Sequence, residues 1–224
     1  RIRDAVKNRV LEPYEARDDF PWMEWRNNWN AVCNSGPAIA ATYLVEDVDR
    51  TARIVTKAAH NMEHYIEGFG PDGCTPEGMG YWNYGFKNYA RMALQLEAIT
   101  DGEYSLLSPP IVREIAQFPL RVELSPERYP AFSDASEQGG VAPFTACWLG
   151  DRLDLPGLAA YGRSNLSSGG IRNLLFAHLT PEDLEMPSPE PSRHFIGHDW
   201  WIARADPENP GGLAVAVKGG HNGE

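Results

Sequence analysis

The chain has 224 residues, of which 42% are hydrophobic and 11% aromatic, enough for the core of one large domain or two smaller ones. Its 31 acidic residues outnumber its 20 basic residues, and the resulting formal charge of -11 disfavours nucleic acid as a partner. No apolar run reaches the roughly 18 residues of a membrane-spanning helix, so no membrane partner is expected either.

Helical patterns dominate the first half of the chain. Ser35-Gly36-Pro37 is a typical helix start, because proline is tolerated in the first turn, and it predicts a helix over Pro37 to Asp47. Apolar residues at helical spacing predict a second helix over Asp49 to Gly68. After a glycine-rich loop, a third helix is predicted over Trp82 to Thr100.

The second half changes character towards its end. Shorter helices are predicted over Ile111 to Gln117, Val141 to Leu153 and Arg172 to His178. The segment Pro181 to Pro191 is rich in proline and acidic residues, which indicates a linker. Beyond it, strands are predicted over His194 to Arg204 and Leu213 to Val217, with a turn at Asp206 to Gly212.

Two segments stand out for their chemistry: RNNWNAVCNSG, from Arg26 to Gly36, and DGCTPEGMGYWNYGF, from Asp72 to Phe86. The second combines glycines, which permit tight backbone turns, with the flat and polar-edged rings of Tyr81, Trp82 and Tyr84. Such a combination suits the binding of a sugar. The same rings would also serve as wedges between helices, and the residues alone leave both interpretations open.

With these motifs the chain resembles the heparinase II/III-like polysaccharide lyases, a family that includes heparin and oligo-alginate lyases. The matching segments follow the family's order: NNWN at Asn27 to Asn30, DGCTPEGMGYWNYG at Asp72 to Gly85, YPAFSD at Tyr129 to Asp134, and LAVAVKGGHNGE at Leu213 to Glu224. The resemblance implies an α+β fold. Residues 1–185 would form part of an α/α toroid, and residues 186–224 a linker and the first strands of an antiparallel β-sandwich. It further implies that the chain is a fragment of a secreted or periplasmic enzyme.

The implied reaction is β-elimination on a polysaccharide that contains uronic acid. A base removes the proton from C5 of the uronic acid, the 4-linked sugar departs, and the substrate carboxylate must be neutralised. In the family a Tyr and a His transfer protons. Tyr84 is the best match for this tyrosine, since it lies 56 residues after Asn28, with Tyr81 as the close competitor. His221 is the corresponding histidine candidate.

The resemblance also assigns substrate contacts. Asn28, Asn30 and Arg26 are expected to bind the carboxylate, because amide and guanidinium donors suit a planar anion. Trp29 stands where many relatives carry a histidine, which leaves the neutralising group in doubt. Glu77 either contacts the sugar, orients Asn28 or Arg26, or caps the helix predicted at Trp82. The full set of expected substrate-binding residues is Arg26, Asn30, Trp29, Glu77 and Trp82. Asn28 and Tyr84 should line one shared cleft, with Glu77 close behind them.

No cofactor is expected in this chain, although the resemblance allows a structural divalent metal in the β domain beyond it. Cys33, Cys74 and Cys147 are odd in number and lack metal-binding spacing, so they predict neither a disulfide framework nor a metal site. The expected partner is an anionic polysaccharide or oligosaccharide. Because strand Leu213 to Val217 would lack part of its sheet partners, this end is expected to be poorly ordered or to be completed by a second copy or another segment.

Three alternatives stay open. The first is a glycoside hydrolase on the same toroid, which would need two carboxylates such as Glu77 and Asp134. The second is a carbohydrate-binding fragment without catalysis. The third is a zinc peptidase, because His60-Asn61-Met62-Glu63-His64 reads H-x-x-E-H on a predicted helix.

Overall fold

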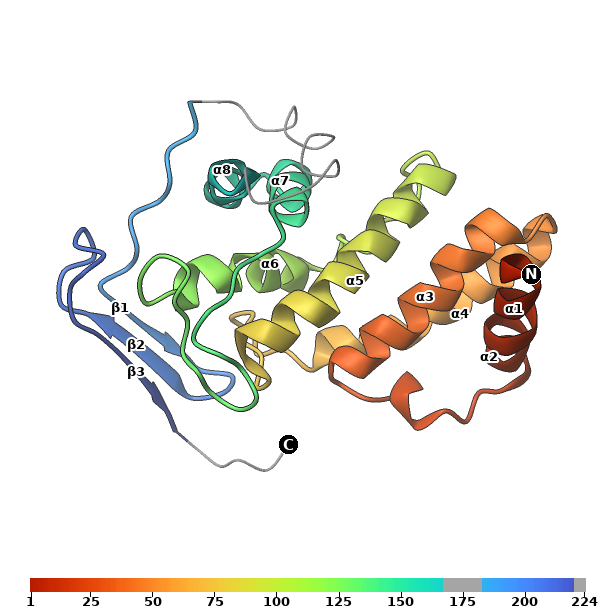
Figure 1. Cartoon of the computed structure of the whole chain (residues 1–224), viewed down its shortest axis with the longest axis horizontal. Helices are drawn as coiled ribbons and strands as arrows, with labels where there is room; N and C mark the ends of the chain where they lie inside the picture. The colour runs from red at the N-terminus through yellow and green to blue at the C-terminus, as the bar shows by residue number, and fades with distance from the viewer. Residues whose placement is uncertain (167–182, 220–224) are drawn as a thin grey trace. The chain divides into compact units, whose positions relative to one another are not determined.

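The computed structural model describes residues 1–166 and 183–219, and shows helices followed by a small antiparallel sheet (Figure 1). The chain divides into two compact units. The first unit comprises Arg1–Gly68 and Tyr84–Ser108, and the second comprises Phe69–Asn83 and Pro109–Glu224. Helix α5 (Gly78–Ile99) contributes to both units. The division into compact units therefore falls within α5, and the expected domain boundary near residue 185 stays a prediction.

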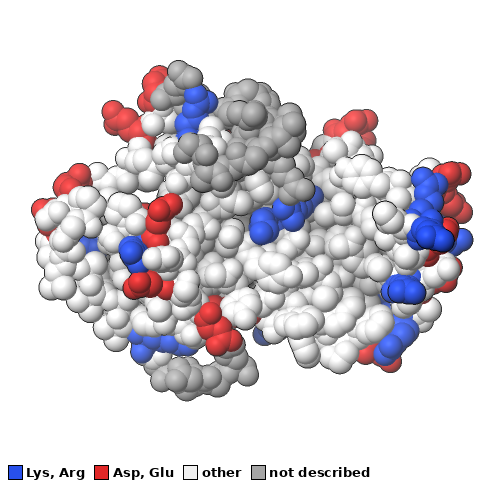
Figure 2. Space-filling view, in the orientation of Figure 1, with Lys and Arg blue, Asp and Glu red and all other residues white. Residues whose placement is uncertain are grey.

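The first unit is helical throughout. Its elements are α1 (Ile2–Val6), a π-helical turn η1 (Lys7–Leu11), α2 (Glu12–Ala16), a 3-10 turn η2 (Pro21–Met23), α3 (Asn28–Leu44), α4 (Val48–Glu67) and the greater part of α5. Basic and acidic side chains are intermixed over the N-terminal helices, at the right-hand edge of Figure 2. Among residues 1–166 and 183–219, no helix has both the length and the apolar character needed to cross a membrane.

Helix α3 begins at Asn28, upstream of the start predicted at Pro37, which lies inside the helix. That prediction was wrong because a stronger start signal precedes it. The side chain of Asn27 accepts a hydrogen bond from the Trp29 backbone N–H at 3.1 Å and caps the helix. An internal proline removes one helical hydrogen bond, so contacts elsewhere in the unit must offset that cost.

A buried polar network supplies such contacts by joining α3 to α2, η2 and α4. The Tyr14 hydroxyl donates to Asn34 Oδ1 at 2.7 Å, and Asn61 Nδ2 donates to the same oxygen at 3.0 Å. Asn30 is completely buried, and its amide donates to the carbonyls of Met23 and Asn61 at 2.7 and 2.9 Å. Burial raises the pKa of the Tyr14 hydroxyl well above its ordinary value. Because buried amides are costly without partners, this network specifies how α3 packs on its neighbours.

The other long helices of the first unit agree better with the sequence. Helix α4 matches the predicted Asp49 to Gly68 within one residue at each end, and the Asp47 side chain caps it by accepting the Arg50 N–H at 2.9 Å. Helix α5 begins at Gly78, four residues before the predicted start at Trp82. The DGCTPEGMGYWNYGF motif is therefore partly loop and partly helix.

Besides the start of α5, the described residues of the second unit form α6 (Pro110–Val122), α7 (Pro143–Arg152), α8 (Pro156–Ser164), β1 (Ser192–Phe195), β2 (Trp200–Arg204) and β3 (Ala214–Lys218). Helix α6 extends the predicted Ile111 to Gln117 in both directions, and α7 matches the predicted Val141 to Leu153. The helix predicted over Arg172 to His178 falls in the range 167–182, which the structure does not describe.

The strands are antiparallel in the order β1-β2-β3. The single strand predicted over His194 to Arg204 was wrong, because it is two strands joined by a turn in which Phe195 pairs with Trp200. Asp199 in this turn has a φ of +51°. Gly197 and Asp199 favour a turn, but the aromatic and apolar residues on both sides favour strands, and the strand signal decided the prediction. The strand predicted over Leu213 to Val217 agrees with β3 within one residue at each end, and it follows the predicted turn.

One face of the sheet packs on the rest of the second unit. Phe195 and Trp200 are buried, with ring centroids 5.4 and 6.1 Å from that of Phe118 in α6. On the other face, Trp201 and Val217 are about half exposed. The sheet is therefore amphipathic, with β3 at its edge.

Arg204, at the end of β2, fastens the sheet to the C-terminal end of α6. The residue is 8% exposed, and its guanidinium donates to the backbone carbonyls of Arg121, Glu123 and Glu190. The last carbonyls of a helix have no partner within the helix, and their partial negative charge favours a cation. The buried charge of Arg204 is thus stabilised mainly by backbone oxygens.

Candidate functional site

Helices α3, α4 and α5 of the first unit meet at Gly85, the residue that follows Tyr84. A Cβ added at Gly85 in α5 would lie 3.1 Å from the Cβ of Asn28 and 2.7 Å from the hydroxyl of Tyr65 in α4. The N-terminus of α3 and the C-terminal turns of α4 therefore contact α5 directly beside Tyr84. Glycine at position 85 permits this close approach.

Asn28 and Tyr84 differ in their access to solvent. Asn28 is 5% exposed, whereas the side chain of Tyr84 is 48% exposed. The carbonyl of Tyr84 accepts a hydrogen bond from Asn88 Nδ2 at 2.8 Å, one turn further along α5. Tyr84 is thus exposed on α5, and the residue that follows it, Gly85, makes the contact with Asn28.

Arg26 precedes α3 and is positioned by the end of α4. Its Nη2 lies 3.0 Å from Glu67 Oε2, and His64 Nδ1 lies 3.5 Å from the same oxygen. Gly68 packs directly under Arg26, because an added Cβ at position 68 would meet the Arg26 carbonyl oxygen at 2.0 Å. The Arg26 side chain keeps 66% of its surface exposed, so its guanidinium is both oriented and accessible to an anion.

Exposed aromatic rings flank this arginine. Trp25 and Trp29 are 44% and 57% exposed, and their rings meet edge to face with centroids 6.4 Å apart. Indole rings give flat apolar surfaces with a polar edge, the kind of surface on which sugar rings stack. Trp29, at the position where the resemblance led us to consider a histidine, supplies such a surface.

Two of the expected substrate-binding residues are structural in this arrangement. Asn30 is completely buried in the polar network of α3 and uses its amide on backbone carbonyls. Trp82 is 1% exposed, and its indole N–H donates to the carbonyl of Ile115 at 3.0 Å within the second unit. Helical periodicity identified neither orientation, because it does not specify which side of a helix faces a neighbour.

Glu77 and Tyr81 belong to the second unit, so their proximity to Asn28 and Tyr84 stays a prediction. Glu77 immediately precedes α5, and its backbone N–H donates to Thr75 Oγ1 at 3.3 Å. Asp72 forms the turn that was expected of it: its Oδ1 accepts the Cys74 N–H at 3.2 Å, and Gly73 has a φ of +79°.

The histidine candidates fare differently. His221 lies outside the residues that the structure describes, so its role stays a prediction. In the H-x-x-E-H segment, His60 and Glu63 have side chains that are 75% and 70% exposed, and His64 turns towards Glu67. Within residues 1–166 and 183–219, no group of three potential metal ligands is assembled.

Sequence analysis missed Tyr65 and Glu67 as members of this cluster. Tyr65 is 2% exposed and lies among the apolar residues of α4, where nothing in the sequence distinguishes it from an ordinary core residue. Its hydroxyl oxygen is buried against Gly85, so it supports Asn28 and cannot reach a ligand itself. Glu67 is at the end of α4 and resembles any surface carboxylate in the sequence. No local signal connects either residue to α3.

The contact at Gly85 leads to a prediction on stability. Gly85→Ala should lower the free energy of unfolding by about 1–3 kcal/mol, because the new methyl group overpacks Asn28 and Tyr65. Gly80→Ala is the matched control in the same helix, since nothing lies within 4 Å of its added Cβ. Alanine there should stabilise the helix by about 0.5–1 kcal/mol. Urea unfolding of both variants measures the difference, and equal midpoints would show that the packing at Gly85 is looser than described.

Comparison with protein-family models and with curated proteins finds no match for this chain.

Proposed function

We propose that this protein is a polysaccharide lyase that cleaves a uronic-acid-containing polysaccharide by β-elimination. The observation that carries this proposal is the packing of Asn28 against α5 beside the exposed Tyr84, with Arg26 fixed nearby by Glu67. The first unit thus holds carboxylate-binding donors and a phenol that can carry a proton. We further propose that the helical part belongs to an α/α toroid and the sheet to a β-sandwich, as in the heparinase II/III-like family.

In the proposed reaction, Arg26 and Asn28 bind the carboxylate of the uronic acid and stabilise the charge that develops on it. A base removes the C5 proton, the electron pair forms the C4–C5 double bond, and the C4–O bond breaks. The departing oxygen receives a proton, so the products are an unsaturated uronate and a free sugar hydroxyl. Tyr84 is the proton-transfer residue in this scheme.

The aromatic pair of Trp25 and Trp29 would support a sugar ring next to the reacting one. The chain as a whole is acidic, so it does not attract a polyanion at long range. Recognition of an anionic oligosaccharide would therefore depend on local donors such as Arg26. The resemblance to the heparinase II/III-like family is the basis for also proposing a secreted or periplasmic location.

The test is a near-ultraviolet assay of the protein on a panel of uronans, including heparan-like and alginate-like polymers. A lyase produces a 4,5-unsaturated uronate that absorbs in this range, and each productive polymer should lose its reactivity when its carboxyl groups are reduced to alcohols. Absence of the absorbing product on every uronan, with the protein shown to be folded, would overturn the proposal.

A glycoside hydrolase remains the second candidate, because the structure brings its two carboxylate-bearing segments together in the second unit. Ser133 Oγ donates to the Pro76 carbonyl at 2.7 Å, and an added Cβ at Gly78 would meet the Ala135 Cβ at 2.6 Å. Glu77 and Asp134 therefore lie on neighbouring segments. New reducing ends without an unsaturated product would favour this candidate over the lyase.

A further inference from the structure

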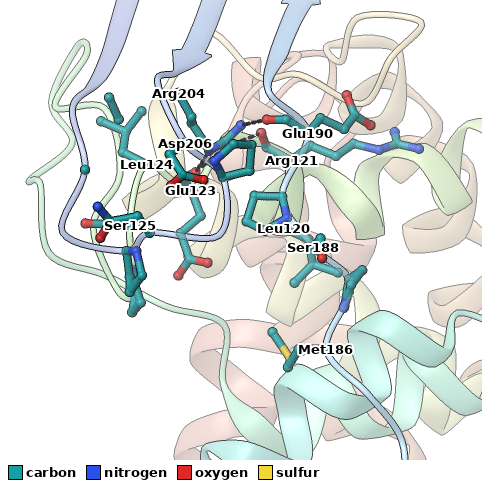
Figure 3. A pocket seen from close by; sticks show the side chains of 18 of the residues that line it. Leu120, Arg121, Glu123, Leu124, Ser125, Met186, Ser188, Glu190, Arg204 and Asp206 are labelled. Atoms are coloured by element: carbon teal, nitrogen blue, oxygen red, sulfur yellow. Dashed lines mark hydrogen bonds between the residues drawn. The ribbon is translucent and has the colours of Figure 1, made fainter.

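The second unit contains a pocket that none of the proposed chemistry uses. It lies between the end of α6, the segment around Met186 to Glu190, and the β2–β3 hairpin (Figure 3). Its volume is about 460 Å³, enough for a small ligand or one long side chain. The pocket combines an apolar wall with a small number of polar groups, which is the usual composition of a ligand site.

Three described residues with carboxyl groups line the pocket, and Glu123 is the least exposed of them, because Glu190 and Asp206 are exposed. Glu123 follows the last residue of α6, and its Oε1 accepts the Glu127 N–H at 2.8 Å. The same oxygen lies 3.4 Å from the hydroxyl of Tyr129, which in turn lies 3.4 Å from that of Tyr161. Burial raises the pKa of the Glu123 carboxyl above its ordinary value. The carboxyl is thus held at the pocket by neutral donors.

The cations around the pocket are already engaged elsewhere. The guanidinium of Arg204 donates its hydrogen bonds to backbone carbonyls, and Figure 3 shows the Glu123 carboxylate pointing away from it. Arg121 pairs with Glu114 at 2.5 Å, and Glu190 pairs with Arg193 at 2.7 Å. Within the described part of the chain, no basic side chain forms an ion pair with Glu123. A carboxyl group therefore lines the pocket without an opposite charge bonded to it.

We propose that this pocket binds the ammonium group of an aliphatic amine, with Glu123 as its counter-ion and the amine's carbon chain along the apolar wall. That wall is formed by Leu120, Leu124, Met186 and the rings of several prolines. An ammonium group donates hydrogen bonds and would supply the positive charge that no basic side chain provides to Glu123. An anionic ligand would meet only acceptor oxygens at that end. The ligand class is independent of the proposed lyase reaction.

Linkage gives the pH dependence of this binding. The cationic ligand favours the ionised carboxylate, so its binding should release a proton from Glu123. Affinity should therefore rise as the pH increases through the raised pKa of Glu123 and then level off. Tyr129, Tyr161, Glu127 and Arg204 are the other titratable groups that influence this carboxyl, and Arg121, Glu190 and Asp206 also line the pocket.

Isothermal titration calorimetry on the whole protein tests the proposal with n-pentylamine, and with 1-pentanol as the uncharged isostere. The amine should bind at least about tenfold more tightly than the alcohol, as a charge-assisted hydrogen bond implies. The ammonium group could come from a free amine or from a lysine side chain of a peptide. Nα-acetyl-lysine methylamide represents the peptide lysine, and its affinity relative to that of n-pentylamine shows which source the pocket prefers.

Glu123→Gln keeps the shape and the acceptor oxygen for the Glu127 N–H, and it should reduce amine affinity about 10- to 100-fold. Glu137→Gln is the control, since that carboxylate pairs with Arg128 and does not line the pocket, and its loss should change affinity less than threefold. Equal binding of amine and alcohol, or affinity that falls as the pH rises, would overturn the proposal. If Glu123→Gln fails to fold, the pH dependence and the amine–alcohol comparison on the unmodified protein decide the matter.

Discussion

Tyr84→Phe should lower the rate of β-elimination about a hundredfold or more, the usual contribution of a positioned acid or base. The substitution keeps the aromatic ring and removes the one atom that can carry a proton. Because the side chain is 48% exposed, the free energy of unfolding should change by less than about 0.5 kcal/mol. The measurement is the initial rate of unsaturated product formation at saturating uronan, together with urea unfolding of both proteins.

Tyr81→Phe is the matched control, three residues earlier in the same helix. It should raise the KM more than it lowers kcat, because in this scheme Tyr81 only contacts substrate. If Tyr81→Phe is inactive while Tyr84→Phe keeps its activity, the proton-transfer tyrosine is one helical turn earlier. If both variants eliminate at the normal rate, the tyrosine mechanism is wrong for this protein.

Arg204→Met should destabilise the second unit by about 3 kcal/mol or more. The substitution preserves the length and apolar contacts of the side chain but leaves the carbonyls of Arg121, Glu123 and Glu190 without their donor. Each buried acceptor left unsatisfied costs about 1–3 kcal/mol. Calorimetric unfolding should show a lower transition temperature, and Arg204→Lys should be intermediate because an ammonium group cannot span three carbonyls.

Arg128→Met is the control for loss of a positive charge. Arg128 lies 2.6 Å from Glu137, but both side chains are largely exposed, at 46% and 68%. Such a pair contributes at most about 1 kcal/mol. Similar destabilisation by the two variants would mean that charge alone, and not the satisfaction of backbone carbonyls, explains the role of Arg204.

The sequence predicted those elements whose signals are local. Helix α4 was placed within one residue because Asp47 caps it and its apolar repeat is regular. The start of helix α3 was predicted too far along the chain because Pro37 resembles a first-turn proline. The cap at Asn27 and the buried amides explain why the helix begins earlier and continues through Pro37. The turn between β1 and β2 was missed because aromatic residues surround it on both sides.

The candidate site was predictable only in part, for a related reason. A motif can propose that Asn28 and Tyr84 act together, but the contact that the structure shows is between Asn28 and Gly85, whose missing side chain carries no chemical signal of its own. The burial of Asn30 and Trp82 depends on the partner each side chain finds in three dimensions. Tyr65 and Glu67 belong to the cluster only because α4 packs against α3 and α5, and no local sequence pattern predicts that packing.

The asparagine network of α3 has a consequence for the kinetics of folding. Its hydrogen bonds join residues 20, 27 and 31 positions apart, whereas the helices themselves form from local contacts. Closing such loops costs entropy before the bonds are gained, and buried amides are desolvated only when the helices dock. The network should therefore form after the main barrier to folding. Interactions of that kind slow unfolding and hardly change the folding rate, so they set how long the native first unit persists before it opens.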